Sequence, residues 1–455
     1  MIVVVGGGLA GLSAALALVD EGAEVTLLER KSRLGGATWS FRRHGLWFDN
    51  GQHVFLRCCT AYRGFLERIG ATGSVLLQDR LELPVVAPGG AVAWLRRNGL
   101  PAPLHLAGSL ARYRHLSIAD RLRLGRALVP LRRAALDDPA LDETTFGAFL
   151  RSHGQRTAAI ERLWDIICTP TVNLPADEAS LTLAATVFQI GLLTDATASD
   201  IGWARVPLAH LHADPAREQL ERAGADIRTN VAVSALEPTS GGIVVRTPGE
   251  QITADAVVVA VPHDVAAALV PADVPGAGSW SALGASPIVD VHLVYDRKVV
   301  DRELFAAIDS PLQFVFDRTS MCGLEGDQQC LAVSLSAATR WINAPADELI
   351  AMAARELTRL FPEAGAARVI DGVVIRERAA TFAGRPGTRR LRPTTRTPVA
   401  GLYLAGAWTD TGWPATMEGA VRSGVSAADA ISSDFGARSL APADWHKRTT
   451  EEVPA

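Results

Sequence analysis

Apolar and small residues at the start of the chain alternate in a way that predicts a strand–helix–strand unit. Residues 2–5 form a short β-branched run, as expected of a buried parallel strand. A helical pattern of alanines and leucines covers residues 12–19, and residues 25–28 predict a second strand that ends at Glu29. This order is typical of the first βαβ unit of an α/β fold.

The remaining patterns mix helices and strands. Strands are predicted at residues 226–236, 256–261, 288–295, 330–335 and 401–407, and helices over much of 104–200, at 346–360 and from 413 onward. No internal repeat is evident in the sequence. The chain is long enough for two or three domains, so these elements need not all join the N-terminal unit.

The turn after the first strand has the spacing of a dinucleotide-binding site. Gly6 permits the tight turn, Gly8 lets the backbone approach a pyrophosphate, and Gly11 lets helix and strand pack closely. The N–H groups of the following helix favour phosphate. Glu29 stands where a carboxylate accepts hydrogen bonds from ribose hydroxyls, which argues against the 2′-phosphate of NADP.

A second glycine pair indicates which dinucleotide is bound. Arg33-Leu34-Gly35-Gly36 follows the second strand directly, and this R-x-G-G stretch resembles the flavin-containing amine oxidase and carotenoid desaturase superfamily. The added backbone N–H groups suit a pyrophosphate, so the sequence favours FAD over NAD. The resemblance implies that Val233 meets the adenine, that the turn at Gly406 with Asp410 meets the pyrophosphate and ribitol, and that a helix N-terminus near Thr416 points at the flavin ring. The predicted cofactor-binding residues are Gly6, Gly8, Ala10, Gly11, Glu29, Arg30, Gly35, Gly36, Ala37, Thr38, Asn50, Gly51, Gln52, His53, Val233, Gly406, Asp410, Thr416 and Met417.

These motifs lie far apart in the sequence, so the predicted fold is a discontinuous Rossmann-like FAD-binding domain with an α+β substrate domain. Residues 1–85, 205–280 and 395–433 are assigned to the FAD-binding domain. Residues 86–204 and 281–394 are assigned to the substrate domain, and 434–455 to a polar tail.

Composition narrows the setting. The net charge of −4 gives no reason to expect nucleic-acid binding, and the five cysteines form neither a C-x-x-C pair nor a metal cluster. Sparse, odd-numbered cysteines favour reduced thiols in the cytoplasm. The N-terminus lacks a positively charged leader, and no segment reaches the ~18 apolar residues of a membrane span. We expect a cytoplasmic protein without a resident metal.

Residues 94–133 are unusually basic. They hold nine arginines against a single acid, Asp120, with leucines interleaved. Two interpretations stay open: a peripheral contact with the inner face of the cell membrane, or a helical cap whose arginines are solvated.

Two further segments resemble one subfamily, the hydroxysqualene dehydroxylases of hopanoid biosynthesis. These are DNGQHV at residues 49–54 and PATMEGAVRSG at residues 414–424, although the second segment also resembles plant-type phytoene desaturases. The resemblance implies a C30 isoprenoid alcohol as substrate, squalene as product, and reductive loss of the hydroxyl by reduced FAD. Because no second G-x-G-x-x-G follows a later strand, the electrons are expected from an external donor.

Such a reaction needs a proton donor, because water is the leaving group. His53 is the first choice, since its segment is expected to pass the flavin; the alternative is that it only orients the cofactor. Asp49 is expected to be structural, and Glu418 to cap or orient the last helix.

Three other functions remain open. A carotenoid-type desaturase takes a similar substrate but runs the redox reaction in the opposite direction. An amine oxidase would need an aromatic cage, which is hard to build with four tyrosines, none of them in the flavin motifs. A prenyl-chain carrier on the same fold would need no flavin, and the intact Glu29 and Gly35-Gly36 argue against it.

Overall fold

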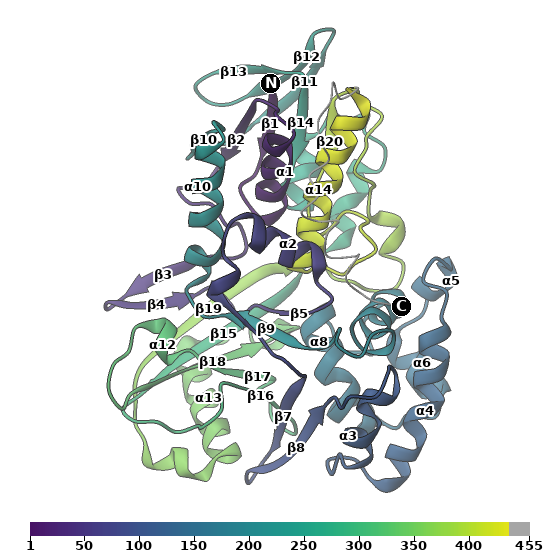
Figure 1. The fold of residues 1–455 in the computed structure, drawn as a ribbon, viewed down its shortest axis with the longest axis vertical. Coiled ribbons are helices and arrows are strands. Elements are labelled where there is room, and N and C mark those ends of the chain that lie inside the picture. The colour runs from purple at the N-terminus through teal and green to yellow at the C-terminus, as the bar shows by residue number, and fades with distance from the viewer. Residues whose placement is uncertain (436–455) are drawn as a thin grey trace.

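The computed structural model describes residues 1–435. It has an upper lobe around a parallel sheet and a lower lobe that combines a large mixed sheet with a group of helices (Figure 1). The predicted polar tail lies outside the described residues, except for Asp434 and Phe435. Asp434 is the last residue of the C-terminal helix α14.

Five parallel strands form the sheet of the upper lobe. Their order is β10-β2-β1-β14-β20, and their bounds are β1 Ile2–Val5, β2 Val25–Glu29, β10 Asp226–Thr229, β14 Ala256–Val259 and β20 Leu402–Leu404. The three central strands are almost completely buried, as a parallel sheet requires. The sheet therefore draws on the start, middle and end of the chain, which confirms the predicted discontinuous α/β fold.

Helices α1 (Leu9–Asp20) and α14 (Met417–Asp434) lie side by side against this sheet, and α10 (Asp214–Arg222) lies next to α1. The two longer helices approach closely, because a Cβ on Gly424 would lie 2.1 Å from the carbonyl oxygen of Ala10. A β-meander extends beyond the sheet: β11 Ala235–Thr239, β12 Gly242–Arg246 and β13 Gln251–Ala254. The connection that leads from β14 to the lower lobe contains α11 (His263–Leu269) and the 3-10 helix η6 (Ala277–Leu283).

A seven-stranded mixed sheet forms one side of the lower lobe. Its order is β19-β15-β18-β17-β16-β7-β8, with bounds β7 Glu82–Ala87, β8 Ala91–Arg96, β15 Ser286–Tyr295, β16 Leu304–Ala307, β17 Phe314–Asp317, β18 Gln329–Leu335 and β19 Val369–Thr381. Helix α13 (Ala346–Leu360) packs on this sheet, and α12 (Thr319–Cys322) precedes β18. The predicted domain boundary at residue 85 falls inside β7, which pairs along its whole length with β8.

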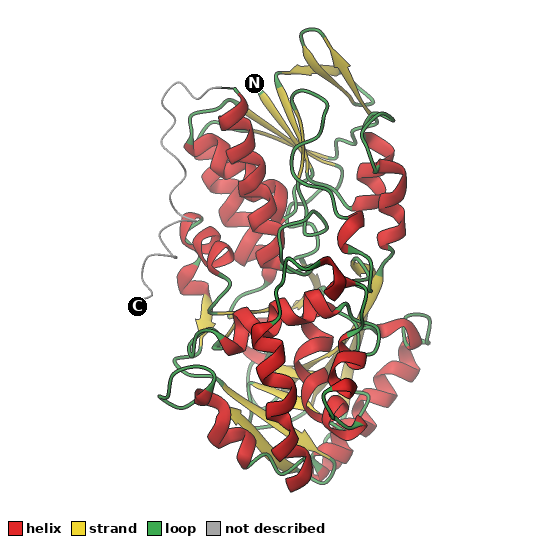
Figure 2. Cartoon of the chain, turned by 90° about the vertical axis from the view of Figure 1, so that its right-hand side faces the viewer, coloured by secondary structure: helices red, strands yellow, loops and turns green. Residues whose placement is uncertain are grey.

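Helices form the other side of the lower lobe (Figure 2). They are α3 Ala107–Ala111, α4 Ile118–Arg133, α5 Pro139–Asp142, α6 Phe146–Ser152, α7 Thr157–Ala159, α8 Asp165–Val172 and α9 Leu181–Phe188, with π-helical turns η3 (Ile160–Trp164) and η4 (Gln189–Leu193).

Two small sheets stand between the lobes, one of β3 (Ser40–Arg43) and β4 (Leu46–Asp49), the other of β5 (Val54–Leu56), β9 (Ile201–Ala204) and β6 (Val75–Leu77). Helix α2 (Thr60–Arg68) packs on α14.

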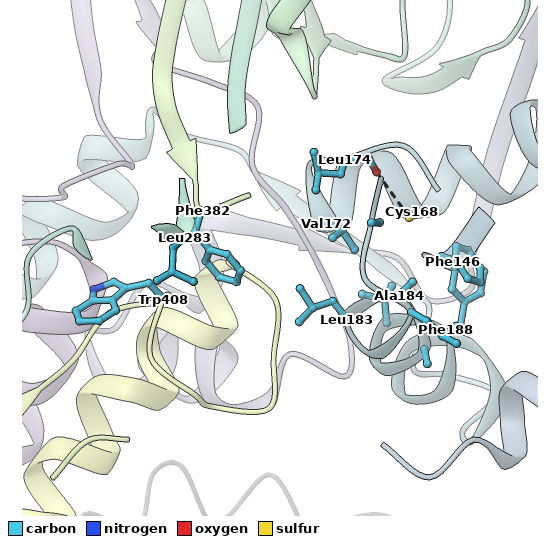
Figure 3. Packing of buried hydrophobic residues seen from close by; sticks show 14 of the residues in the cluster. Phe146, Cys168, Val172, Leu174, Leu183, Ala184, Phe188, Leu283, Phe382 and Trp408 are labelled. Atoms are coloured by element: carbon cyan, nitrogen blue, oxygen red, sulfur yellow. Dashed lines mark hydrogen bonds between the residues drawn. The ribbon is translucent and has the colours of Figure 1, made fainter. Parts of the chain in front are cut away.

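One hydrophobic cluster joins the helices of the lower lobe to the end of the upper lobe. Figure 3 shows Phe146, Leu183 and Phe188 in the helical part, and Leu283, Phe382 and Trp408 on the side of the C-terminal block. Because both groups belong to one packed core, the two lobes meet over buried apolar surface. Among the described residues, no helix combines the length and the apolar character needed to cross a bilayer.

Candidate active site

A single cavity of about 950 Å³ runs from the glycine turn to the helices of the lower lobe. At one end it is lined by backbone-rich segments, among them Gly6, Gly8, Gly36, Val233 and Gly406. At the other end it is lined by apolar side chains, including Leu106, Leu110, Leu124, Leu128, Leu163 and Phe188. The cavity therefore has a nucleotide end and an apolar end.

The nucleotide end depends on glycines that tolerate no side chain. Gly6 has φ +108°, and a Cβ on Gly11 would lie 1.8 Å from the Gly6 carbonyl oxygen. Gly36 has φ +57°, and its Cβ would lie 2.7 Å from the Cα of Gly8. The two glycine motifs thus touch each other through backbone. Since no side chain caps the N-terminus of α1, its N–H groups are available to a phosphate.

Glu29 is held rigidly at the end of β2. Its Oε2 accepts a hydrogen bond from Gly7 N at 2.7 Å, and its Oε1 accepts one from Lys31 N at 2.7 Å. Each carboxylate oxygen keeps further acceptor capacity for ribose hydroxyls. Arg33 donates to the Gly36 carbonyl oxygen at 3.3 Å and stacks over the Trp39 ring, so it ties the second glycine pair to the following loop.

Most of the predicted cofactor-binding residues line the cavity. They are Gly6, Gly8, Ala10, Glu29, Arg30, Gly35, Gly36, Ala37, Thr38, Asn50, Gly51, Gln52, His53, Val233, Gly406, Thr416 and Met417. Gly11 lies behind the turn, where it allows close packing against Gly6. Asp410 is exposed and accepts a hydrogen bond from Gly412 N within its own turn, so the structure places it outside the cavity. The cradle of glycines and uncapped helix N–H groups fits a dinucleotide.

The C-terminal block reaches the cavity through a loop held by Arg392. This buried guanidinium donates to the carbonyl oxygens of Thr409 at 2.5 Å and Trp413 at 2.8 Å. Burial lowers the pKa of Arg392 to about 10, which still leaves it charged at neutral pH. Helix α14 begins where predicted, with Thr416 as N-cap accepting from Gly419 N at 3.2 Å. Its N-terminal turn faces the cavity through Thr416 and Met417.

The segment at residues 49–53 connects β4 to β5 and is fixed by buried polar contacts, and its residues 50–53 line the cavity. Asp49 pairs with Arg318 at 3.1 Å and accepts from Leu208 N at 2.9 Å, so it is structural, as predicted. Asn50 donates to the Ala37 carbonyl oxygen at 2.8 Å and to Glu377 at 2.9 Å. The segment is thereby connected to both the glycine loop and the mixed sheet.

His53 lines the cavity, but its hydrogen bonding gives it the character of an acceptor. Its Nδ1 lies 3.1 Å from the Gly51 carbonyl oxygen, which can only accept, so Nδ1 carries the proton. Burial lowers the pKa of His53, which favours the neutral ring with a free electron pair on Nε2. The sequence-based choice of His53 as proton donor stays a prediction.

Glu418, which was expected to cap or orient the last helix, connects α14 to α2. It does not cap its own helix; its carboxylate accepts from Ala61 N at 3.2 Å and Tyr62 N at 2.8 Å, at the N-terminus of α2. Burial raises the pKa of Glu418, and the Arg422 contact opposes that shift. Within residues 1–435, no group of His, Cys, Asp and Glu side chains is arranged to hold a metal ion.

Sequence reasoning missed three polar residues at the cavity or beside it: Asp290, Glu377 and Arg392. Asp290 and Glu377 come from strands of the mixed sheet, far in sequence from every glycine motif. For Asp290 a signal existed, because an acid interrupts the apolar strand SPIVDVHLVY. Glu377 and Arg392 lie in polar stretches that give no such signal.

Comparison with known proteins agrees with this geometry. The family model described as flavin containing amine oxidoreductase matches residues 9–432. The chain belongs to this family. It is therefore an oxidoreductase of a flavin-containing family, and the superfamily predicted from R-x-G-G is confirmed.

Curated relatives include a hydroxysqualene dehydroxylase from Rhodopseudomonas palustris, 30% identical over 94% of this chain and 97% of the relative. A 15-cis-phytoene desaturase from Solanum lycopersicum is 27% identical over 95% of this chain and 78% of the relative. Among solved structures, wild-type putrescine oxidase matches with a TM-score of 0.71 at 19% identity, over 95% of this chain and 98% of that one. An oxidoreductase from Methanosarcina mazei matches with a TM-score of 0.73 at 18% identity, over 94% of this chain and 99% of that one. The structural matches support the fold.

Proposed function

We propose that the protein is an FAD-dependent oxidoreductase that converts hydroxysqualene to squalene. The observation that carries the proposal is the cavity itself, which joins a dinucleotide cradle to a long apolar space lined by leucines. The hydroxysqualene dehydroxylase relative, similar over nearly the whole chain, supports the choice of substrate. FAD, when bound, would supply hydride from its reduced ring; an external electron donor would restore the reduced form.

The chain's own residues would contribute three things. The glycine loops, Glu29 and Val233 would hold the adenosine diphosphate half of FAD. The apolar end would bind the thirty-carbon chain and exclude water from the allylic cation formed when the C–O bond breaks. Residues 50–53 line the same cavity and would provide polar groups beside the hydroxyl of the substrate.

Product analysis under anaerobic conditions tests the reaction. The purified protein is reconstituted with FAD, reduced chemically, and mixed with hydroxysqualene; we expect squalene and reoxidation of the flavin spectrum. A parallel sample contains oxidised flavin and 15-cis-phytoene. Flavin reduction by phytoene, without squalene formation from the alcohol, would contradict the proposal and favour a desaturase, the activity named for the tomato relative.

We further propose that residues 94–133 dock on the anionic inner face of the cell membrane, where the substrate dissolves. Five of the eight exposed large hydrophobic side chains among the described residues fall in this segment: Leu100, Leu104, Ile118, Leu122 and Val129. Leu122 is 80% exposed and Ile118 69%, on a helix that also carries several arginines. The opposite side of the same segment lines the cavity through Leu106, Leu110, Leu124 and Leu128. Exposed apolar side chains among arginines suit an anionic lipid surface.

Co-sedimentation with vesicles of phosphatidylglycerol and phosphatidylcholine tests the docking. We expect wild-type protein to bind and the Ile118→Glu/Leu122→Glu double variant to stay in solution. Ile370→Glu is the matched control, because Ile370 is 47% exposed on the mixed sheet, outside the segment. Equal binding of all three proteins would contradict this surface.

A further inference from the structure

Asp290 occupies an unusual position for an acid. It lies in the middle of β15, its exposed fraction is 1%, and it lines the cavity. Its Oδ1 accepts a hydrogen bond from Gln52 N at 3.3 Å, while no hydrogen bond reaches Oδ2. A Cβ on Gly51 would lie 3.1 Å from that same Oδ2. The carboxyl group is thus packed directly against the segment that carries His53.

Two other residues that line the cavity also have unpartnered polar atoms. Gln52 Nε2 and Ser199 Oγ are buried and make no hydrogen bond within the described residues, and both residues line the cavity. Buried polar groups are normally satisfied, so unpaired ones at a cavity wall indicate a polar group of a ligand.

Resting on the proposed function, we propose that Asp290 is the acid that protonates the departing hydroxyl of the substrate. The proton moves from Asp290 Oδ2 to the hydroxyl oxygen, the allylic C–O bond breaks with its electron pair leaving on oxygen, and water departs. Reduced FAD, when bound, would supply the hydride that the carbon needs, and Asp290 remains as a carboxylate until solvent reprotonates it. Alcohol, hydride and proton thereby give hydrocarbon and water.

The surroundings keep this acid protonated at neutral pH. Burial raises the pKa of Asp290 to about 8, and the charges of Glu377 on β19 and Asp49 on β4 act in the same direction, while the hydrogen bond from Gln52 N and the nearby Ser334 hydroxyl oppose the shift. Arg318, a buried cation beside Asp49, is already paired with that residue at 3.1 Å. Burial favours neutral His53, whose only ring proton, on Nδ1, is directed at the Gly51 carbonyl oxygen. Asp290 is therefore the residue that can donate a proton to the substrate hydroxyl.

Turnover of two substrates separates an acid from a structural residue. For hydroxysqualene we expect Asp290→Asn to lower kcat by about 10²–10⁴-fold, because general acid catalysis contributes that much. For the acetate ester of the same alcohol, whose leaving group needs no proton, we expect the variant to stay within a few-fold of wild type. Wild-type kcat on the alcohol should fall above pH 8, the range in which Asp290 ionises. Asp165→Asn, which changes a half-buried acid outside the cavity, should match wild type on both substrates.

Infrared difference spectroscopy gives a readout that needs no turnover. Wild type minus Asp290→Asn at pH 7 should show the carbonyl band of a protonated acid, and the band should vanish above pH 9. A missing band, full activity of the variant on the alcohol, or equal losses on alcohol and ester would overturn the assignment. Wild-type protein that forms no squalene would overturn both proposals, whereas a fully active Asp290→Asn variant would overturn only this one.

Discussion

The two ends of the cavity differ in composition: backbone groups form one end and apolar side chains form the other. The nucleotide end consists of backbone: glycines in left-handed conformations, an uncapped helix and carbonyl groups held by Arg392. The apolar end consists of side chains from α3, α4, η3 and α9. Backbone geometry allows almost no substitution, whereas apolar packing needs only the right volume and polarity. The difference suggests that cofactor identity is fixed tightly and that substrate choice can change by repacking.

The largest effect should come from a methyl group in the nucleotide cradle. Gly36→Ala places a Cβ 2.7 Å from the Cα of Gly8 at φ +57°, so we expect loss of most bound flavin, measured by visible absorbance per protein. Gly73→Ala is the control, because its Cβ would meet nothing within 4 Å. A Gly36→Ala protein with a full complement of flavin would show that the cradle is looser than its geometry indicates.

The second-largest effect is expected for the segment at residues 49–53. Asp49→Ala leaves the Arg318 guanidinium buried without its partner, which should lower the free energy of unfolding by about 3–5 kcal/mol in urea denaturation. Arg318→Met added to Asp49→Ala removes the orphaned charge and should restore part of that loss. If the double variant is no more stable than Asp49→Ala, the ion pair is not the source of the effect.

A polar side chain at the apolar end should weaken substrate binding without touching the flavin. Leu128→Gln loses apolar contact worth about 1.5–3 kcal/mol, so kcat/KM for hydroxysqualene should fall roughly 10–100-fold. The flavin spectrum should not change. Leu122→Gln, on the exposed side of the same helix, should keep wild-type kcat/KM with detergent-solubilised substrate. Similar losses in both variants would point to damage of α4 as a whole.

The last prediction concerns the dependence of stability on pH. Folded Asp290 has a pKa of about 8, above its ordinary value near 3.8, so the folded state binds more protons between these pH values. Stability contributed by this group is therefore lost as pH rises through that window, and wild type should lose more stability than Asp290→Asn between pH 5 and pH 9. Thermal unfolding of both proteins as a function of pH measures this difference in stability. If stability falls with pH equally in both proteins, the pKa of folded Asp290 is not raised.

The structure agrees with the sequence best where function depends on local geometry. Gly6, Gly8 and Gly11 with Glu29, and Gly35 with Gly36, each act within a short stretch, so their spacing was sufficient to predict the site. The helix beginning after Thr416 was found for the same reason. Asp410 does not line the cavity, because whether a turn faces a cavity or solvent depends on the packing around it.

By itself, the sequence determined the dinucleotide cradle, the buried parallel strands and the mainly helical character of residues 104–200, because hydrophobic periodicity and glycine spacing are local properties. Only the tertiary structure decided that Glu418 caps α2, that Arg318 neutralises Asp49, and that Asp290 from the mixed sheet faces the segment at residues 50–53. These contacts join residues more than two hundred positions apart in the chain. Their partners are set by how the sheets and helices pack, which no short stretch of sequence encodes.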